Sequence, residues 1–430
     1  MLDAPTATSL AVIDMAQRGR FEEICELFAP ALRPMVTAEA LRLAWASAVD
    51  EHGPVTSIGA LVAEPTGPGV TTVKIPVTFE HGALTIIVST TATGDLTGIQ
   101  LAPAEAAQPT AVWEPPGYVE PDRFDEHEVT LGSGLLAVSG TLTVPQRSGP
   151  LPALVLLPGS GPIDRDETIG RNKPFKDLAW GLATRGIAVL RFDKVTYSHP
   201  AEVKQMANFT VVDEYMPAAV AAIELLRQYP AIDARSIFLL GHSLGGTVAP
   251  RIAASEPSVA GLVLLAGGSE PMYWSAVRQL RYLASLDPTT AAASAPAIEE
   301  MSKRARRVDS PDLSPSTPAD DLPFAIPAPY WLDLRSYDPV ATAAELDRPI
   351  LILQGGRDYQ VTAADDLALW QSTLSLRADV DIRVYPSDNH MFFPGNGPST
   401  PAEYESAQHL DGAVVGDIAD WLASLRQFLS

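Results

Sequence analysis

The sequence predicts an α/β protein with a mostly parallel, doubly wound sheet, a helical lid insertion and a small N-terminal α+β domain. Short apolar runs alternate with helical patterns from about residue 124 onward. Most of these runs are apolar at consecutive positions, as expected for strands buried on both faces. The chain of 430 residues is also longer than one ordinary domain. We therefore expect a buried parallel sheet preceded by a smaller, separate domain.

The first hundred residues are predicted to form helices followed by an antiparallel meander. Amphipathic patterns over 8–28 and 37–50 predict two helices, with Thr8 and Thr37 as their N-caps. Strand-like runs follow, separated by glycine and proline, at 55–64, 71–80, 83–92 and 96–103. This order of elements is typical of a cone-shaped pocket domain.

The second part of the chain begins with two antiparallel strand candidates, after which strands and helices alternate. The runs predicted as parallel strands are 153–159, 187–193, 236–241, 259–267, 350–356 and 381–387. An insertion of about 80 residues interrupts this alternation between the fourth and fifth runs, and insertions of that length are usually lids or disordered segments. We therefore expect a lid there.

These patterns divide the chain into three parts. Residues 1–105 form the N-terminal domain, and the Ala- and Pro-rich stretch 106–123 is a linker. Residues 124–430 form the second domain, with the lid insertion at about 269–347.

Composition excludes several classes of partner. The chain has 30 basic and 52 acidic residues, a net charge of −22, and so would repel nucleic acid and anionic membranes. Cys25 is the only cysteine, so no intrachain disulfide forms and no structural zinc spacing exists. No phosphate-binding glycine motif is present: Gly-x-x-x-x-Gly-Lys-[Ser/Thr] is absent, and no Gly-x-Gly-x-x-Gly opens a helix after a strand. Without a signal peptide or a long apolar run, the sequence indicates a cytoplasmic protein.

The sharpest motif is Gly241-His242-Ser243-Leu244-Gly245, which lies directly between an apolar strand and a helical pattern. A bare Gly-x-Ser-x-Gly occurs by chance in about one chain in ten of this length. At a tight strand-to-helix turn, however, crowding demands glycine on both sides and exposes the serine at the edge of the sheet. The position therefore predicts Ser243 as a nucleophile.

A serine nucleophile needs a base to take its proton and an acid to hold that base. His390 follows the last strand, whereas the alternative His409 lies in a helical or surface segment. Asp358 follows an apolar strand and a Gly-Gly turn, which brings it to the same sheet edge as the serine. Asp388 is the rival acid, but it lies only two residues before the histidine. We expect His390 as the base and Asp358 as the acid.

Acyl transfer also requires donors for the oxyanion of the transition state. The backbone N–H of Leu244, directly after the nucleophile, is one candidate. The glycine-rich loop after the strand at 153–159 supplies the other, through the N–H of Ser160 or Gly161.

Several motifs of the chain together resemble those of a known family. The motifs GHSLGG, GRDYQV and DNHMFF, and the stretch 156–194, resemble bacterial α/β-hydrolases of the dienelactone hydrolase and esterase-like group over about 124–430. The resemblance implies the α/β-hydrolase fold and hydrolysis of a carboxylic ester without a cofactor. It also implies Ser243 as the nucleophile, with Asp358 and His390 as its partners. The chain departs from many esterases at Pro158, where those have histidine.

The N-terminal part resembles the small domain of unknown function that precedes some of these hydrolases. Three roles stay open for it: substrate binding, covering of the active site and formation of a homodimer.

The resulting hypothesis is a serine hydrolase that cleaves a small-molecule ester, lactone or thioester through an acyl-enzyme. Two alternatives stay open. The same residues would serve an acyltransferase, cyclase or thioesterase of a biosynthetic pathway, and the fold could also be that of a non-catalytic binding protein.

Overall fold

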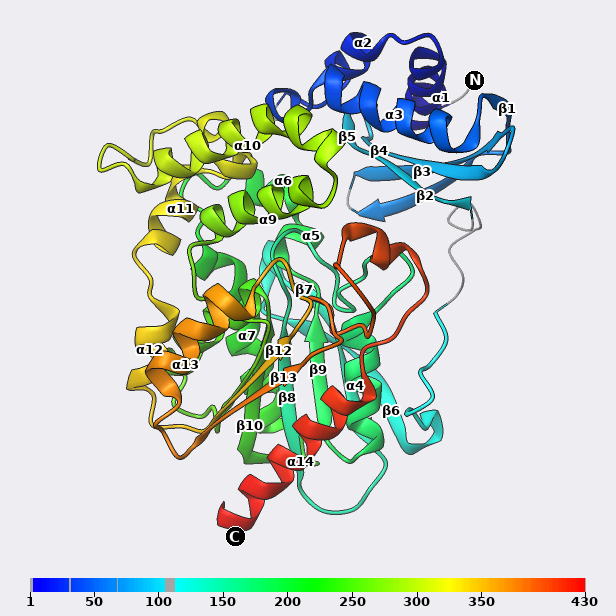
Figure 1. Ribbon diagram of the computed structural model, residues 1–430. Coiled ribbons are helices and arrows are strands. Elements are labelled where there is room, and N and C mark those ends of the chain that lie inside the picture. Colours follow the sequence, from blue (N-terminus) through cyan, green and yellow to red (C-terminus); the bar gives the residue numbers. More distant parts are fainter. Residues whose placement is uncertain (1–2, 31, 68, 105–112, 430) are drawn as a thin grey trace. The chain divides into compact units, whose positions relative to one another are not determined.

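The computed structural model describes residues 3–30, 32–67, 69–104 and 113–429 (Figure 1). The chain forms two compact units. The first comprises Met1–Ala111, Ala276–Ala328 and Pro401–Ser406, and the second Val112–Ser275, Pro329–Thr400 and Ala407–Ser430. Residues 106–112 of the predicted linker lie outside the described residues.

The first unit begins with two helices where one was predicted. Helix α1 (Ala4–Gln17) starts before the predicted cap Thr8, because the Asp3 carboxylate accepts a hydrogen bond from a backbone N–H of the first turn. Gly19, with φ +71°, then ends the helix, and α2 (Phe21–Glu26) follows. The prediction of a single helix was therefore wrong.

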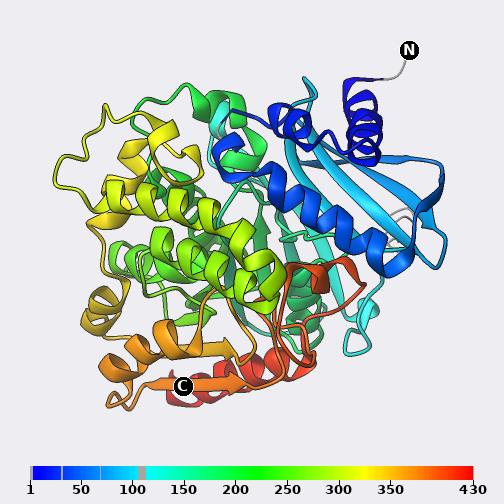
Figure 2. The same ribbon diagram turned by 45° about the horizontal axis from the view of Figure 1, so that its top comes forward.

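The third helix, α3 (Ala38–His52), begins as predicted. The Thr37 hydroxyl caps it by accepting a hydrogen bond from the Ala40 N–H at 3.1 Å. A short turn, η1 (Arg33–Met35), precedes it. Figure 2 shows these helices over one face of the sheet that follows, and their apolar side chains share a core with the sheet.

The sheet of the first unit is an antiparallel meander, as predicted. Its strands are β1 (Val55–Ile58), β2 (Val62–Gly67), β3 (Val70–Phe79), β4 (Ala83–Thr91) and β5 (Leu96–Pro103). The predicted run 55–64 is two strands, β1 and β2, which both pair with β3. Strand β4 pairs with β3 and with β5.

The predicted insertion is helical. It contains α9 (Met272–Leu286), α10 (Pro288–Asp309), η5 (Ala319–Asp321), η6 (Pro323–Ala325), α11 (Ala328–Arg335) and α12 (Pro339–Glu345). Helix α10 packs against α3 and η1 within the first unit. The middle of the insertion thus belongs to the same compact unit as the N-terminal helices.

The second unit contains an eight-stranded, mostly parallel sheet. Its strands are β6 (Phe124–Leu131), β7 (Val138–Pro145), β8 (Leu151–Leu157), β9 (Ala188–Phe192), β10 (Ile232–His242), β11 (Leu262–Leu265), β12 (Ile350–Gly355) and β13 (Val380–Tyr385). Their order is β13-β12-β11-β10-β8-β9-β7-β6. All pairs from β13 to β9 are parallel, whereas β7 runs antiparallel to both β9 and β6.

Helices cover both faces of this sheet (Figure 1). Helices α4 (Pro174–Thr184) and α14 (Gly412–Leu429) share one core with alternate residues of the strands, such as Leu154 and Leu240. Helices α7 (Val211–Gln228) and α8 (Leu244–Ser255) pack on β10 and on each other. Consecutive strand residues are buried because both faces are covered, which explains the continuous apolar runs.

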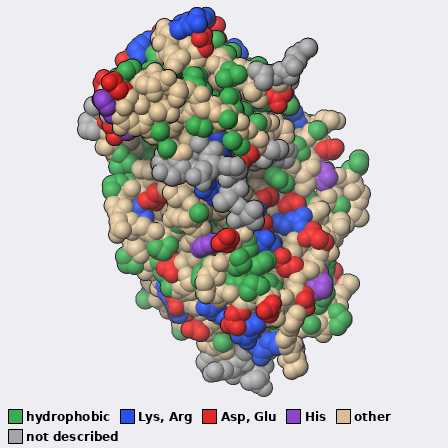
Figure 3. All heavy atoms as spheres, turned by 90° about the vertical axis from the view of Figure 1, so that its right-hand side faces the viewer, with side chains coloured by type: hydrophobic (Ala, Val, Ile, Leu, Met, Phe, Trp, Pro, Cys, Tyr) green, Lys and Arg blue, Asp and Glu red, His purple; other side chains and the backbone are tan. Residues whose placement is uncertain are grey.

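The remaining elements of the two units are short. They are η3 (Pro121–Arg123), η4 (Gly134–Leu136), α5 (Val195–Ser198), α6 (Pro200–Lys204), η7 (Ala363–Leu367), α13 (Ala368–Leu374) and η8 (Pro401–Glu405). No helix within the described residues is both long and apolar enough to cross a membrane. On the face drawn in Figure 3, acidic and basic side chains are interspersed.

Candidate functional site

Ser243 lies at a strained turn between β10 and α8. Its backbone has φ 53° and ψ −120°, a conformation that L-residues other than glycine rarely adopt. The flanking glycines are required by contact: a Cβ on Gly241 would collide with the Gly245 carbonyl, and one on Gly245 with the Leu157 carbonyl. The turn therefore holds the serine at the carboxyl end of the central strand.

Asp358 and His390 form a buried pair on the loops after β12 and β13. Asp358 Oδ2 lies 2.7 Å from His390 Nδ1, and both side chains are almost fully buried. The other carboxylate oxygen, Oδ1, accepts the backbone N–H groups of Gln360 and Val361 at 2.8 and 3.0 Å. Because the carboxylate accepts the Nδ1 proton, His390 Nε2 is left as an acceptor.

The parallel sheet brings these groups to one edge. Strands β8, β10, β12 and β13 run in the same direction, so the loops after their carboxyl ends meet there. The ring centroids of His242 and His390 are 4.7 Å apart. A Cβ placed on Gly159 would lie 3.4 Å from Ser243 Cβ. Among the described residues Ser243 Oγ has no hydrogen-bond partner, which leaves the hydroxyl free to rotate.

The rival acid and base lie in other environments. Asp388 accepts a weak hydrogen bond from the Ser387 hydroxyl at 3.4 Å. His409 Nδ1 lies 3.2 Å from both carboxylate oxygens of Asp177, and its ring packs edge-on against Trp113. The structure thus pairs Asp358, rather than Asp388, with His390.

The glycine loop after β8 lies beside Ser243 and leaves the N–H groups of Ser160 and Gly161 without an acceptor among the described residues. The N–H of Gly159 donates to Glu167 Oε1 at 2.7 Å. Leu244 is the first residue of α8, and a helix leaves its first N–H groups without intrahelical acceptors. Gly161, the alternative donor, has φ +90°.

His242, the residue before Ser243, links this loop to the His390 loop. Its Nδ1 lies 2.9 Å from Glu167 Oε1, and its Nε2 lies 2.9 Å from the His390 carbonyl oxygen. A carbonyl can only accept, so Nε2 carries a proton. Burial alone would lower the pKa of His242, but the Glu167 carboxylate and its hydrogen bond outweigh burial and raise it. The pair therefore favours a buried imidazolium-carboxylate contact behind the nucleophile.

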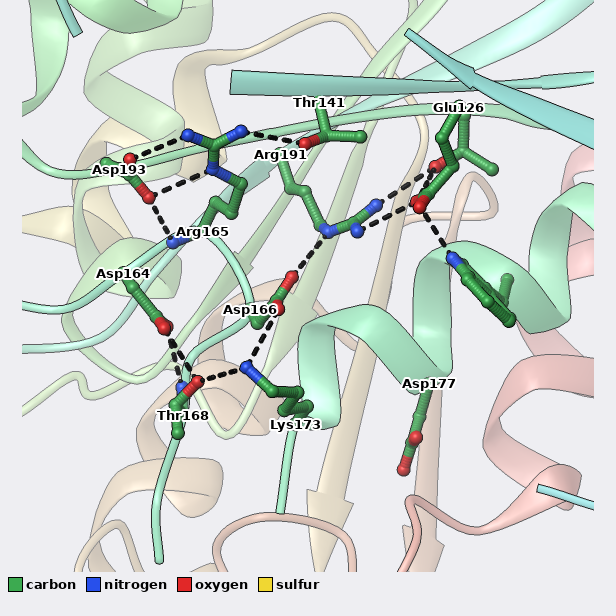
Figure 4. Close-up of polar contacts among 12 residues, drawn as sticks. Glu126, Thr141, Asp164, Arg165, Asp166, Thr168, Lys173, Asp177, Arg191 and Asp193 are labelled. Atoms are coloured by element: carbon green, nitrogen blue, oxygen red, sulfur yellow. Dashed lines mark hydrogen bonds and ion pairs between the residues drawn. The ribbon is translucent and has the colours of Figure 1, made fainter. Parts of the chain in front are cut away.

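Ion pairs hold Arg165 and Asp166, the two residues before Glu167 in the sequence (Figure 4). Asp166 bonds to Arg191 Nε at 2.8 Å and to Lys173 Nζ at 3.0 Å. Arg165 bonds to Asp193 at 2.9 Å. Burial would raise the pKa of Asp166, but the two cations lower it below its ordinary value. Glu167 has φ 53°, and these contacts fix its neighbours so that its carboxylate reaches back to the glycine loop.

A cluster of three further buried polar residues forms hydrogen bonds with the carbonyl groups of the glycine loop. Lys194 follows β9, and Glu214 and Tyr215 lie on α7. Lys194 Nζ donates to the Gly159 carbonyl at 2.9 Å and pairs with Glu214 at 3.0 Å. Sequence patterns did not predict a role for these residues or for Glu167. The one signal that could have pointed to this cluster is a lysine two residues after the buried strand β9.

Asp388, two residues before His390, has a buried carboxyl group whose ionisation affects the stability of the fold. Its Oδ2 is buried without a hydrogen-bond partner in the described part of the chain. Burial raises the pKa of Asp388 to about 6, and Asp411 adds to the rise. The unfolded-state pKa is about 3.9. Because the folded-state pKa is higher, the ionised carboxylate destabilises the fold above pH ~6, and this penalty disappears as the pH falls to ~4.

Replacing Asp388 by asparagine should therefore stabilise the protein at pH 8 but not at pH 4. We expect a gain of about 1 to 3 kcal/mol in unfolding free energy at pH 8, measured by urea denaturation. Asp122→Asn, at an exposed position, serves as the control and should change stability at neither pH. An equal gain from Asp388→Asn at both pH values would contradict this account.

A metal site is not evident in this region. Within the described ranges, no group of three or more His, Cys, Asp or Glu side chains is arranged to hold a metal ion.

Comparison with known proteins identifies similar chains. The model of the alpha/beta hydrolase family matches residues 154–408. The esterase EstD of Thermotoga maritima is 36% identical over 344 residues, which cover 80% of this chain and 77% of that protein. The 2,6-dihydropseudooxynicotine hydrolase of Paenarthrobacter nicotinovorans is 30% identical over 131 residues, covering 30% of this chain and 32% of that protein.

Solved structures with a similar arrangement include Est1E from Butyrivibrio proteoclasticus. It is 15% identical, with a TM-score of 0.44, and the match covers 70% of this chain and 99% of that one.

Proposed function

Since this chain belongs to the α/β hydrolase family and is a carboxylic ester hydrolase, we propose that it cleaves its ester through an acyl-enzyme on Ser243. His390 serves as general base and general acid, and Asp358 orients it. The observation that carries this proposal is the buried 2.7 Å contact between Asp358 and His390, at the sheet edge where the strained Ser243 turn lies.

The first half of the reaction forms the acyl-enzyme. Ser243 Oγ attacks the ester carbonyl carbon while its proton passes to His390 Nε2, and the carbonyl π electrons move onto oxygen. The tetrahedral intermediate then collapses, which breaks the bond to the alcohol oxygen. His390 returns its proton to that departing oxygen.

The second half repeats these steps with water. His390 takes a proton from the water as it attacks the acyl carbon, and Ser243 leaves with that proton. In both halves the oxyanion is stabilised by the backbone N–H groups of Leu244 and Ser160, close to the positive end of the α8 dipole. Asp358 stabilises the imidazolium that forms twice in the cycle.

If the reaction passes through an acyl-enzyme, the ratio of hydrolysis product to methanolysis product should not depend on the leaving group of the substrate. The enzyme would be given two acetate esters with different leaving groups, p-nitrophenyl acetate and phenyl acetate, in the presence of methanol. Water and methanol then compete for one common intermediate, so the ratio of acetic acid to methyl acetate should be the same for both substrates. Product analysis by gas chromatography measures this ratio.

A ratio that depends on the leaving group would contradict the common acyl-enzyme. A constant ratio with methyl acetate as the main product, even at low methanol, would instead favour the acyltransferase alternative over the hydrolase.

A further inference from the structure

In the Gly159–Ser160 peptide unit, the carbonyl group is hydrogen-bonded and the N–H group is not, within the described part of the chain. Its carbonyl oxygen accepts hydrogen bonds from Lys194 Nζ at 2.9 Å and from Tyr215 Oη at 2.8 Å. All described peptide bonds are trans, and in a planar trans peptide the C=O and N–H point in opposite directions. Fixing the Gly159 carbonyl therefore fixes the direction of the Ser160 N–H, which has no acceptor among the described residues.

The preceding peptide unit is held from both sides. The Pro158 carbonyl accepts from Tyr215 Oη at 2.8 Å, and the Gly159 N–H donates to Glu167 at 2.7 Å. The single Tyr215 hydroxyl hydrogen is thus shared between two consecutive carbonyls of the loop. These contacts leave the loop little freedom to rotate about Gly159, even though glycine itself is flexible.

Each hydrogen of the Lys194 ammonium group has an acceptor in this cluster. An ammonium group has three hydrogens, and Lys194 Nζ contacts three acceptors: the Gly159 carbonyl, Tyr215 Oη at 2.9 Å and Glu214 Oε1 at 3.0 Å. The Glu214 carboxylate is itself held by the Tyr330 hydroxyl at 2.5 Å. The hydrogen bonds therefore determine where the ammonium group lies.

Removing the Lys194–Glu214 ion pair from water costs desolvation free energy. Lys194 is fully buried and Glu214 is 4% exposed. Burial lowers the pKa of Lys194, although Glu214 opposes the effect. A buried ion pair contributes little net stability compared with apolar side chains of the same volume. Stability alone therefore explains the cluster poorly, whereas its contacts with the Pro158 and Gly159 carbonyls point to a role in orienting the loop.

We infer that Lys194 and Tyr215 are positioning residues that turn the Ser160 N–H toward the oxyanion of the transition state. This inference rests on the proposed function, in which Ser160 is an oxyanion donor. Both side chains are fully buried, so neither touches the substrate and both act through the carbonyls of the glycine loop. The positive charge of Lys194 also polarises that peptide unit and strengthens its N–H as a donor.

Two substitutions test the inference. Tyr215→Phe keeps the ring but removes the hydroxyl, and should lower kcat on p-nitrophenyl acetate about 10- to 100-fold. Lys194→Met removes the ammonium group and should lower kcat about 100- to 1,000-fold, as the loss of one oxyanion donor does. KM should change less than twofold in both variants, because the donor acts mainly in the transition state.

An aryl trifluoromethyl ketone supplies a readout that a merely structural role would not move. Ser243 Oγ adds to the ketone carbon, the carbonyl electrons become an alkoxide, and the proton passes to His390. The inhibition constant should rise by about the same factor as kcat falls. Tyr118→Phe is the matched control, because its hydroxyl also donates to a backbone carbonyl, that of Leu410 at 2.8 Å. It should retain wild-type kcat and inhibition.

Three results would overturn the inference: a kcat within twofold of wild type in Tyr215→Phe, a loss confined to KM, or unchanged inhibition by the ketone. If Lys194→Met does not fold, Tyr215→Phe alone decides. Failure of the proposed function is a separate result, because it would appear as turnover of the otherwise wild-type protein that does not require Ser243.

Discussion

Replacing Ser243 by alanine should lower kcat on a short p-nitrophenyl ester by about 10⁵- to 10⁶-fold. The loss is this large because His390 then has no hydroxyl to deprotonate and no covalent intermediate can form. A residual rate above that of buffer is still expected, since the backbone donors of the loop and of α8 remain in place. Steady-state kinetics with substrate above KM measures the effect.

The control for this substitution is Ser255→Ala, at the exposed end of the same helix. It should retain wild-type kcat. Equal activity of the Ser243→Ala variant and the wild type would rule out Ser243 as the nucleophile. The unfolding free energy of Ser243→Ala should be equal to or greater than that of the wild type, because alanine removes a polar group from a strained turn.

Replacing Asp358 by asparagine should lower kcat by about 10³- to 10⁴-fold, the second largest effect expected. The geometry gives the reason. Oδ1 of Asp358 faces two backbone N–H donors, so the amide oxygen of asparagine must occupy that position. The amide NH₂ then faces His390 Nδ1 and forces the proton onto Nε2, the atom that has to accept the proton of Ser243.

Asp388→Asn is the matched control, because it removes a carboxylate only two residues before His390. It should keep kcat within about twofold of wild type while stabilising the protein at pH 8. Loss of activity in Asp388→Asn together with full activity in Asp358→Asn would reverse the assignment of the acid.

The sequence pointed to Ser243, Asp358 and His390 because each follows a predicted strand. Strands β10 and β12 are mostly buried, whereas β13, which precedes His390, is a partly exposed edge strand. A continuous apolar run is recognisable in sequence, and parallel strands deliver the residues after their carboxyl ends to one edge of the sheet. The structure pairs Asp358 with His390 at 2.7 Å, as these patterns predicted. The alternation of strands and helices and the antiparallel N-terminal sheet were predictable because each segment has a recognisable hydrophobic pattern in the sequence.

The supports of the glycine loop could not be predicted, because they depend on contacts that are distant in sequence. Glu167 meets His242 across 75 residues, and Lys194 meets Tyr215 across 21. Neither pair forms a periodic pattern. The grouping of α10 with the N-terminal helices has the same origin, since it results from packing against α3 rather than from local propensity. The division of the first helix was missed because Asp3 and Gly19, rather than Thr8, set its ends.

The central claim is that Ser243 is the residue that becomes acylated. The measurement that tests it most directly is treatment of the folded, active wild-type protein with a fluorophosphonate, followed by mass spectrometric mapping of the modified peptide. We predict one phosphonyl group per chain, located on Ser243, with activity lost in proportion to labelling and labelling much slower in Asp358→Asn. Complete inactivation with the label on another residue, or full activity after Ser243 is labelled, would contradict the account.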